Sequence, residues 1–232
     1  MAFSIARQRT IKKMLLGLFA VTMAMSLACS LSIQHGHADV PVAASADEIR
    51  PLSAGRDAPR FTVETVDGEP FHFEPRGLER PAVLIAFRGG WCPYCNVHLS
   101  ELRHVLPAIQ AMGVDVLFLS GDRPELLYSS LDADTQADIG GLGFTILSDA
   151  KAGAAIALGI AFRAADDTIQ RRRDKGQDID GSSMALQGVL PVPSVFAVDT
   201  DGIIRFAYSN ADYTVRLPAD ELLAAATGIV PR

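Results

Sequence analysis

The chain has 232 residues, of which 49% are hydrophobic, enough to build one well-packed domain behind a removable N-terminal segment. Its formal net charge is −6, with 27 acidic residues against 21 lysines and arginines. This negative balance argues against nucleic acid as a partner, because a nucleic-acid-binding surface has to be basic.

Residues 1–38 have the layout of a secretory signal peptide. Basic residues from Arg7 to Lys13 precede an apolar run from Met14 to Ala28, and the small residues Gly36 and Ala38 mark a cleavage site. The sequence therefore predicts an exported, most simply a periplasmic, protein that begins after Ala38.

Two alternatives fit the same segment. Cys29, in Leu27-Ala28-Cys29, resembles the lipidated residue of a lipoprotein. The apolar run Met14–Ile33 also has the about 20 residues that an uncleaved membrane-spanning anchor needs. Either alternative would tether the protein to a membrane through its N-terminus alone, and all three leave only Cys92 and Cys95 in the folded domain.

Residues 39–56 are rich in Ala, Pro and Ser and show no periodicity, so we predict a linker or an N-terminal arm. The folded domain is then expected over residues 57–232. It opens with two alternating segments, Phe61–Val66 and Phe71–Phe73, on either side of Asp67-Gly68. This pattern predicts a β-hairpin.

The cysteine pair follows a run that is typical of a buried strand. Ala82–Phe87 is continuously apolar, which predicts a strand covered on both faces. Arg88-Gly89-Gly90 ends it, and Trp91-Cys92-Pro93-Tyr94-Cys95 comes next. Apolar residues then recur at helical spacing up to Met112-Gly113, and Pro93 suits the first helical position. The two cysteines are therefore expected at a strand-to-helix junction.

The rest of the chain continues the alternation of strands and helices. We predict a strand over Val114–Leu119, a helix from Pro124 to about Asp138, a strand over Phe144–Leu147, a helix over Lys151–Ala157, an extended stretch over Leu158–Phe162, a strand over Ser194–Val198, its return strand over Ile203–Tyr208 and a closing helix over Ala219–Ala226. The polar stretch Asp166–Ser183 contains Arg171-Arg172-Arg173, which we interpret as a solvated helix face. Together these elements predict an α/β fold with a mixed central sheet flanked by helices.

The position of the cysteines suggests their chemistry. A thiol reacts as its thiolate, and the N-terminus of a helix favours negative charge. Cys92 is expected there, with a lowered pKa and a partly exposed sulfur, as the nucleophile. Cys95 lies about one turn further along, more shielded, as the resolving thiol that closes a redox-active Cys92–Cys95 disulfide. Arg88 either adds positive potential or is a solvated arginine at a strand end.

A disulfide between residues so close in the chain would stabilise the fold little, which favours a redox role. A metal site is the rival explanation, since His98 and His104 lie nearby. A structural zinc site needs four ligands, and the spacing of His104 does not direct it to the same point. We therefore predict no metal and no cofactor, with both histidines on the helix surface. Trp91 and Tyr94 are expected to shape the rim beside the sulfurs.

The motif Trp91–Cys95 resembles the active site of thioredoxins and has the Cys-Pro-Tyr-Cys core of glutaredoxins. The wider segments Phe87–Asn96, Leu147–Asp149, Leu190–Pro193 and Asp212–Arg216 resemble the peroxiredoxin-like branch of the alkyl hydroperoxide reductase/thiol-specific antioxidant family. This resemblance implies a thioredoxin-like fold with a peroxiredoxin-type insertion before Pro193. It also implies that Pro193 is a cis proline and that Val192 and Pro193 line the substrate groove.

The chain departs from the typical peroxiredoxin pattern around the reactive cysteine. Typical peroxiredoxins have Thr or Ser three residues before the reactive cysteine, where this chain has Gly89. They have proline four residues before that position, where this chain has Ile85, and an activating arginine before the late strand, which is missing here. We therefore predict first an exported thiol–disulfide oxidoreductase, acting on a protein or small-molecule disulfide with a dithiol reductant or oxidant as partner. The alternative is a thiol peroxidase that reduces hydroperoxides, with Arg88 in the activating role, and a third is a non-catalytic thioredoxin-fold binding module.

Overall fold

The computed structural model describes residues 42–231. The expected signal peptide and Cys29 lie outside the described residues.

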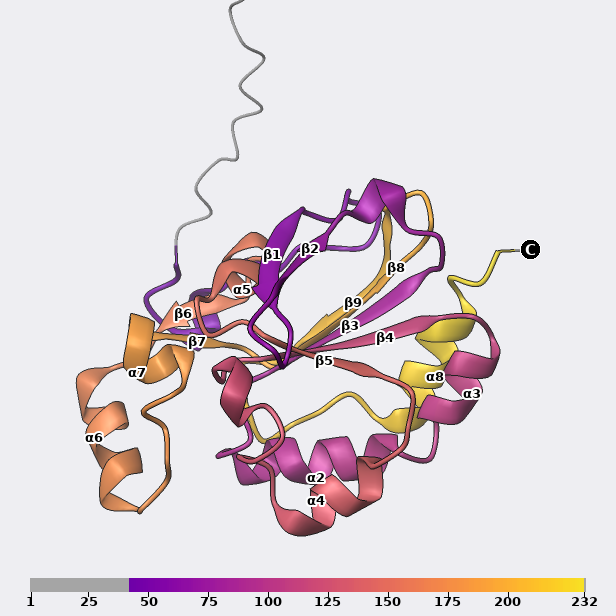
Figure 1. Ribbon diagram of the computed structural model, residues 1–232. Helices are drawn as coiled ribbons and strands as arrows, with labels where there is room; N and C mark the ends of the chain where they lie inside the picture. Colours follow the sequence, from indigo (N-terminus) through magenta and orange to yellow (C-terminus); the bar gives the residue numbers. More distant parts are fainter. Residues whose placement is uncertain (1–41, 232) are drawn as a thin grey trace, which may run out of the picture. The chain divides into compact units, whose positions relative to one another are not determined.

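A mixed seven-stranded sheet forms the centre of the domain, in the order β2-β1-β5-β4-β3-β8-β9 (Figure 1). Its strands are β1 (Phe61–Glu64), β2 (Pro70–Phe73), β3 (Ala82–Phe87), β4 (Asp115–Ser120), β5 (Thr145–Ser148), β8 (Ser194–Val198) and β9 (Ile204–Ser209). β3, β4 and β5 are parallel, whereas the hairpins β1-β2 and β8-β9 add antiparallel pairs on either side. The predicted mixed sheet is confirmed, with an antiparallel hairpin at both edges.

Helices cover both faces of this sheet. The helices are α2 (Pro93–Leu102), α3 (Leu106–Ala111), α4 (Ala133–Ile139), α5 (Gly153–Ala157) and α8 (Ala219–Thr227). Alternate residues of β3 point to opposite sides: Val83, Ile85 and Phe87 belong to the core shared with α2, α3 and α8, and Leu84 and Ala86 to the core shared with α5. β3 is thus buried on both faces, as its unbroken apolar sequence predicts.

Two predicted helices are shorter in the structure. The helix after Cys92 ends at Leu102, and α3 begins anew with Pro107 in its first turn, a proline that would break an uninterrupted helix. Pro124–Leu126 forms one 3-10 turn, and α4 begins only at Ala133. Tertiary contacts hold the loop between them, because Leu131 is buried and the Asp132 N–H donates to Asn96 Oδ1 at 2.9 Å.

The described part of the predicted arm, residues 42–56, is hydrogen-bonded to the domain. The Arg50 and Leu52 N–H groups donate to the carbonyls of Gly159 and Leu158, at 3.2 and 3.1 Å. Gly159 has a φ of +72°, and a Cβ there would lie 2.1 Å from the Arg50 carbonyl oxygen. A glycine is therefore required where the arm crosses the domain.

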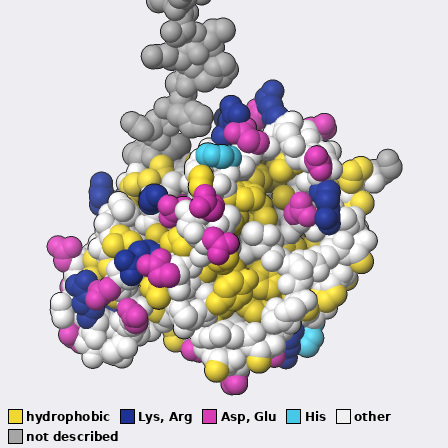
Figure 2. Space-filling model, in the orientation of Figure 1, with side chains coloured by type: hydrophobic (Ala, Val, Ile, Leu, Met, Phe, Trp, Pro, Cys, Tyr) yellow, Lys and Arg dark blue, Asp and Glu magenta, His cyan; other side chains and the backbone are white. Residues whose placement is uncertain are grey.

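An insertion separates β5 from β8 and forms its own two-stranded sheet, visible in orange in Figure 1. It contains α5, β6 (Ala161–Arg163), α6 (Asp166–Asp174), α7 (Ser183–Gln187) and β7 (Val189–Pro191). α6 has no buried residue. On the face drawn in Figure 2, its region carries both basic and acidic side chains.

The expectation of a cis peptide bond before Pro193 is wrong, since no peptide bond between residues 42 and 231 is cis. The chain instead runs in an extended, trans conformation from β7 into β8. The Val192 N–H donates to the Ile160 carbonyl at 2.9 Å, and Ser194 Oγ donates to the Val192 carbonyl at 2.9 Å. These bonds hold Val192 against the small sheet while Ser194 already pairs in the central one. None of the helices in this part of the chain has the length and apolar character needed to span a bilayer.

Candidate active site

Cys92 caps the N-terminus of α2, directly after the turn that follows β3. Its backbone is extended, Pro93 is the first helical residue, and the Cys95 N–H donates to the Cys92 carbonyl at 2.9 Å. Gly89 in the preceding turn has a φ of +139°, and a Cβ there would lie 2.5 Å from both Asp122 Oδ1 and Trp91 Nε1. The predicted strand-to-helix junction is confirmed, and the turn needs glycine to bring Trp91 so close to Asp122.

Asp122 fixes this turn from the end of β4. Its Oδ2 accepts hydrogen bonds from the Gly90 N–H at 2.7 Å and from Ser130 Oγ at 2.9 Å. Asn96 holds the other side, because its Nδ2 donates to the Gly90 carbonyl at 2.6 Å. Burial raises the pKa of Asp122 to about 6. Asp122 was not predicted as a site residue, although the sequence places it in a turn after a buried strand.

Both cysteines are free thiols, and both are buried. Cys92 is 1% exposed and Cys95 is fully buried, so the expectation of a partly exposed Cys92 is wrong. Cys92 belongs to the hydrophobic core, and the insertion contacts the residue before it: Gln177 Nε2 donates to the Trp91 carbonyl at 2.9 Å, and the Arg172 guanidinium lies 5.6 Å from the Trp91 ring centre. The segment after α6 thus packs beside the N-terminus of α2.

The two thiols have opposite pKa shifts. The pKa of Cys92 is lowered to about 6, mainly by a hydrogen bond from the Cys95 thiol, with a further contribution from the Arg88 charge, while burial opposes the shift. Burial raises the pKa of Cys95, and its hydrogen bond to Cys92 raises it further. At neutral pH the pair therefore consists of a Cys92 thiolate and a protonated Cys95.

Arg88 is buried, at 4% exposure, so it is not a solvated arginine at a strand end. Its guanidinium carbon lies 4.4 Å from the Tyr213 ring centre and 5.5 Å from that of Trp91. Its Nε and one terminal nitrogen are buried without a hydrogen-bond partner. Burial lowers the pKa of Arg88, whereas the cysteines beside it raise it. Arg88 thus places a positive charge and two unused donors next to Cys92.

Arg216 is the second cation beside the cysteine pair. In the sequence it was noted only as part of the segment Asp212–Arg216 that resembles the family. Its guanidinium donates to Cys95 Sγ at 3.5 Å. Arg216 also faces His98, whose pKa is lowered to about 4, mainly by burial. His98 is 5% exposed and its Nε2 lies 3.2 Å from the Leu217 carbonyl oxygen, so the expected surface position is wrong. His104 is exposed, as predicted.

Among residues 42–231, no three His, Cys, Asp or Glu side chains gather as a possible metal site.

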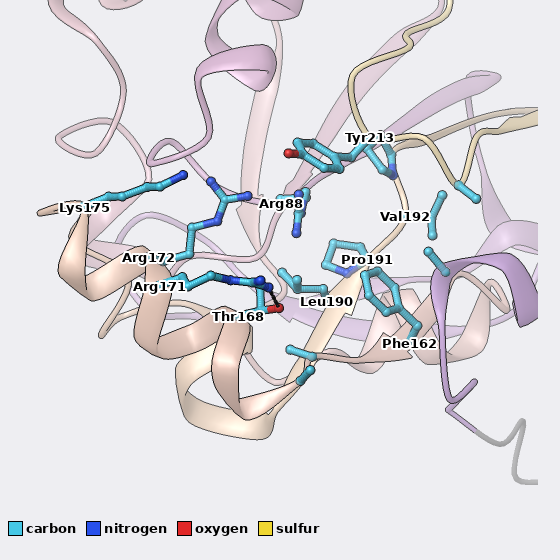
Figure 3. Close-up of a pocket in the computed structure, with 15 residues that line it drawn as sticks. Arg88, Phe162, Thr168, Arg171, Arg172, Lys175, Leu190, Pro191, Val192 and Tyr213 are labelled. Carbon is cyan, nitrogen blue, oxygen red and sulfur yellow. Dashed lines mark hydrogen bonds between the residues drawn. The ribbon is translucent and has the colours of Figure 1, made fainter.

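A cavity of about 440 Å³ opens beside Arg88, under the insertion (Figure 3). Val192 and Pro193 line it, as the expected groove requires, together with Arg172 and Tyr213. Arg172 is half-buried, so a fully solvated Arg171–Arg173 run is wrong for this residue. Its position depends on tertiary contacts of α6 with Trp91 and Tyr213 that the local sequence does not encode.

Of the other expected rim residues, Trp91 is buried, whereas Pro93 and Tyr94 are exposed. The Tyr94 ring packs edge-on against Tyr213, with 5.7 Å between ring centres.

Comparison with known proteins identifies the family and the fold. Residues 54–207 match the AhpC/TSA family. The chain belongs to this family. Among curated relatives of this AhpC/TSA protein, it is 26% identical over 151 residues to the thiol-disulfide oxidoreductase ResA of Bacillus thuringiensis subsp. konkukian, covering 65% of this chain and 66% of that one. It is also 33% identical over 101 residues to peroxiredoxin Bcp of Escherichia coli K12, covering 44% of this chain and 60% of that one.

Each of these matches thus spans just under two thirds or less of the relative's own length. Both relatives carry the names of thiol-based oxidoreductases.

Solved structures show the same fold. Peroxidoxin BcpB from Mycobacterium tuberculosis superposes with a TM-score of 0.54 at 18% identity, over 77% of this chain and 98% of that one. The C45S mutant of peroxiredoxin 6 from Arenicola marina gives a TM-score of 0.58 at 17% identity, over 76% and 72%. The AhpC/TSA chain therefore has the thioredoxin-like fold of peroxiredoxins.

Proposed function

We propose that this protein is an exported thiol–disulfide oxidoreductase, with Cys92 as nucleophile and Cys95 as resolving thiol. The observation that carries the proposal is the divided protonation of the pair, in which the pKa of Cys92 is lowered to about 6 while that of Cys95 is raised. A thiolate beside a protonated thiol is the starting state for two successive displacements.

In the first displacement the Cys92 thiolate attacks one sulfur of a substrate disulfide. The substrate S–S bond breaks, a mixed disulfide forms on Cys92, and the departing thiolate takes a proton. Cys95 then loses its proton, a step that the adjacent Arg216 charge favours. Its thiolate attacks the Cys92 sulfur, which releases the second substrate thiol and leaves the Cys92–Cys95 disulfide. Two electrons have passed to the substrate, and a dithiol partner returns them.

Thiol peroxidase is the second candidate, favoured by membership of the AhpC/TSA family and by the two unpaired Arg88 donors beside Cys92. The Cys92 thiolate would attack the terminal hydroperoxide oxygen, break the O–O bond and release an alcohol or water. The resulting sulfenic acid would condense with Cys95 to the same disulfide, with loss of water.

One paired assay separates the two. The protein lacking residues 1–38 is tested for reduction of insulin disulfides and for consumption of hydrogen peroxide and an organic hydroperoxide, each with a dithiol reductant. Disulfide reduction without peroxide turnover is the expected result. Fast peroxide turnover that depends on Cys92, with a sulfenic acid on Cys92 in the Cys95→Ser variant, would make the protein a peroxidase. Inactivity in both assays would favour a binding module.

Export rests on the sequence of residues 1–38. Expression of the full chain in a bacterium, followed by fractionation and N-terminal sequencing, is expected to give a periplasmic protein that begins at Asp39. A product that stays in the membrane fraction would indicate lipidation at Cys29 or an uncleaved anchor.

A further inference from the structure

The cavity beside Arg88 combines an apolar floor with exclusively positive charge, and the exchange reaction does not explain this combination. Its floor is apolar and includes Phe162, Leu190 and Val192, whereas every charged residue that lines it is a cation: Arg88, Arg171, Arg172 and Lys175. Figure 3 shows Arg172 and Lys175 extending from the α6 side towards Arg88 and Tyr213. In a chain with a net charge of −6, a cavity with only basic charged residues is a local reversal of sign.

These cations have few carboxylate partners in the protein itself, although Arg88 also faces the Cys92 thiolate. Within residues 42–231 no carboxylate lies within ion-pair distance of Arg88, Arg172 or Lys175, and Arg171 has only a 3.6 Å contact with the exposed Asp167. Arg88 and Arg172 also lie against the same two rings, those of Trp91 and Tyr213. Two guanidinium groups held this close repel each other, and an anion between or beside them would remove that repulsion.

Arg88 supplies independent evidence for a ligand. Its guanidinium lines the cavity, the residue is 4% exposed, and two of its nitrogens have no hydrogen-bond partner. Leaving buried donors unpaired is costly, which indicates that a bound group satisfies them. The charge of Arg88 also acts on Cys92, which is 1% exposed and is not among the residues that line the cavity.

We propose that this cavity binds a small organic disulfide that carries a carboxylate. The carboxylate lies between the Arg88 and Arg172 guanidinium groups, where it accepts from the unpaired Arg88 donors, and Arg171 and Lys175 add positive charge. The carbon body lies on the apolar floor, with the S–S bond directed towards Cys92. A volume of about 440 Å³ matches small-molecule sites and exceeds the need of hydrogen peroxide. This substrate class rests on the proposed function and deepens it. The reaction balances as before: one substrate disulfide and the dithiol give two substrate thiols and the Cys92–Cys95 disulfide.

The test uses a single turnover of the pre-reduced protein without residues 1–38, followed by stopped flow. The substrates are 5,5′-dithiobis(2-nitrobenzoate), which carries two carboxylates, and 4,4′-dithiodipyridine, which is neutral and of similar shape. The ratio of the two rates is divided by the same ratio for free dithiothreitol, to remove intrinsic reactivity. We expect a preference of about tenfold or more for the anionic disulfide, the size of one charge-assisted contact.

The variant Arg171→Gln/Lys175→Gln is expected to lose this preference, because its rate with the anionic disulfide should fall more than its rate with 4,4′-dithiodipyridine. Lys151→Gln/Arg205→Gln removes the same charge from exposed positions outside the cavity and should keep the preference. The preference should also fall as salt rises.

An equal ratio in the wild type and the cavity variant would overturn the proposal. The proposal would also be overturned if the cavity variant lost insulin reduction to the same extent as it lost reduction of the anionic disulfide, because the cations would then serve protein substrates. Failure of the wild type with both small disulfides and with insulin would instead refute the exchange function itself.

Discussion

The two sides of the Cys92 site are built differently. On one side the β3–α2 junction is part of the core, with Phe87, Cys95 and Leu99 at or below 1% exposure. On the other side α6 has no buried residue, and its segment reaches the site through polar contacts such as Gln177 with Trp91. The Cys92 sulfur, the proposed nucleophile, thus belongs to the core side, while the cations that face the cavity come largely from the side that can be altered with little effect on the core.

This difference gives a rule for substitutions. Changes on the core side should affect chemistry and stability together, whereas changes on the α6 side should affect access and selectivity. The following predictions test that division, beginning with the largest effect.

Cys92→Ser is expected to reduce disulfide exchange to the uncatalysed rate, since it removes the nucleophile. Cys95→Ser should instead accumulate a mixed disulfide between Cys92 and the substrate, visible by non-reducing mass spectrometry. Normal turnover by Cys95→Ser would show that another thiol resolves the intermediate.

Asp122→Ala is expected to lower the free energy of unfolding by about 1–3 kcal/mol, because the buried Gly90 N–H loses its acceptor. Urea denaturation measures the loss. Asp134→Ala, on the exposed first turn of α4, is the control and should stay within about 0.5 kcal/mol. Equal stabilities for the two variants would mean that Asp122 does not fix the turn.

Arg88→Met should raise the pKa of Cys92 from about 6 towards its usual value near 9, because the nearby positive charge is lost. In the wild type, the rate of Cys92 alkylation by iodoacetamide should rise with pH through about 6 and then level off, as the thiolate replaces the thiol. The midpoint of this profile should move to higher pH in Arg88→Met and less in Arg88→Lys. An unmoved midpoint would assign the shift to Cys95 and Arg216 instead.

Gln177→Ala should have the smallest effect. Loss of its hydrogen bond to the Trp91 carbonyl is expected to speed alkylation of Cys92 by about two- to fivefold, with a stability change of about 1 kcal/mol or less. Gln170→Ala, at an exposed position on α6 just before this segment, is the control. If both variants behave alike, the α6 segment does not limit access to Cys92.

The same division explains what could be predicted from the sequence. The β3–α2 junction is encoded in contiguous residues, from the apolar run Ala82–Phe87 to Pro93, so periodicity and turn residues located it correctly. Arg172, Tyr213 and Arg216 come from distant segments and meet only when the insertion and the loop before α8 pack against α2. Local patterns could not show this convergence.

Burial was misjudged for the same reason. Cys92 stands at a helix start and His98 on a helix face, positions that are often exposed. Their burial depends on tertiary packing, which places Cys92 in the core and the Leu217 carbonyl against His98. The conformation of Pro193 was inferred from family resemblance, and the local hydrogen bonds of Val192 and Ser194 decide otherwise.

The position of Trp91 has a spectroscopic consequence. It is the only tryptophan in the chain, it precedes Cys92, and two guanidinium groups lie near its ring. Excitation at the red edge of indole absorption therefore yields emission from this one place in the molecule. Thiolates and disulfides quench a neighbouring indole to different extents. The intensity of that emission is thus an intrinsic, label-free signal of the redox state of the cysteine pair.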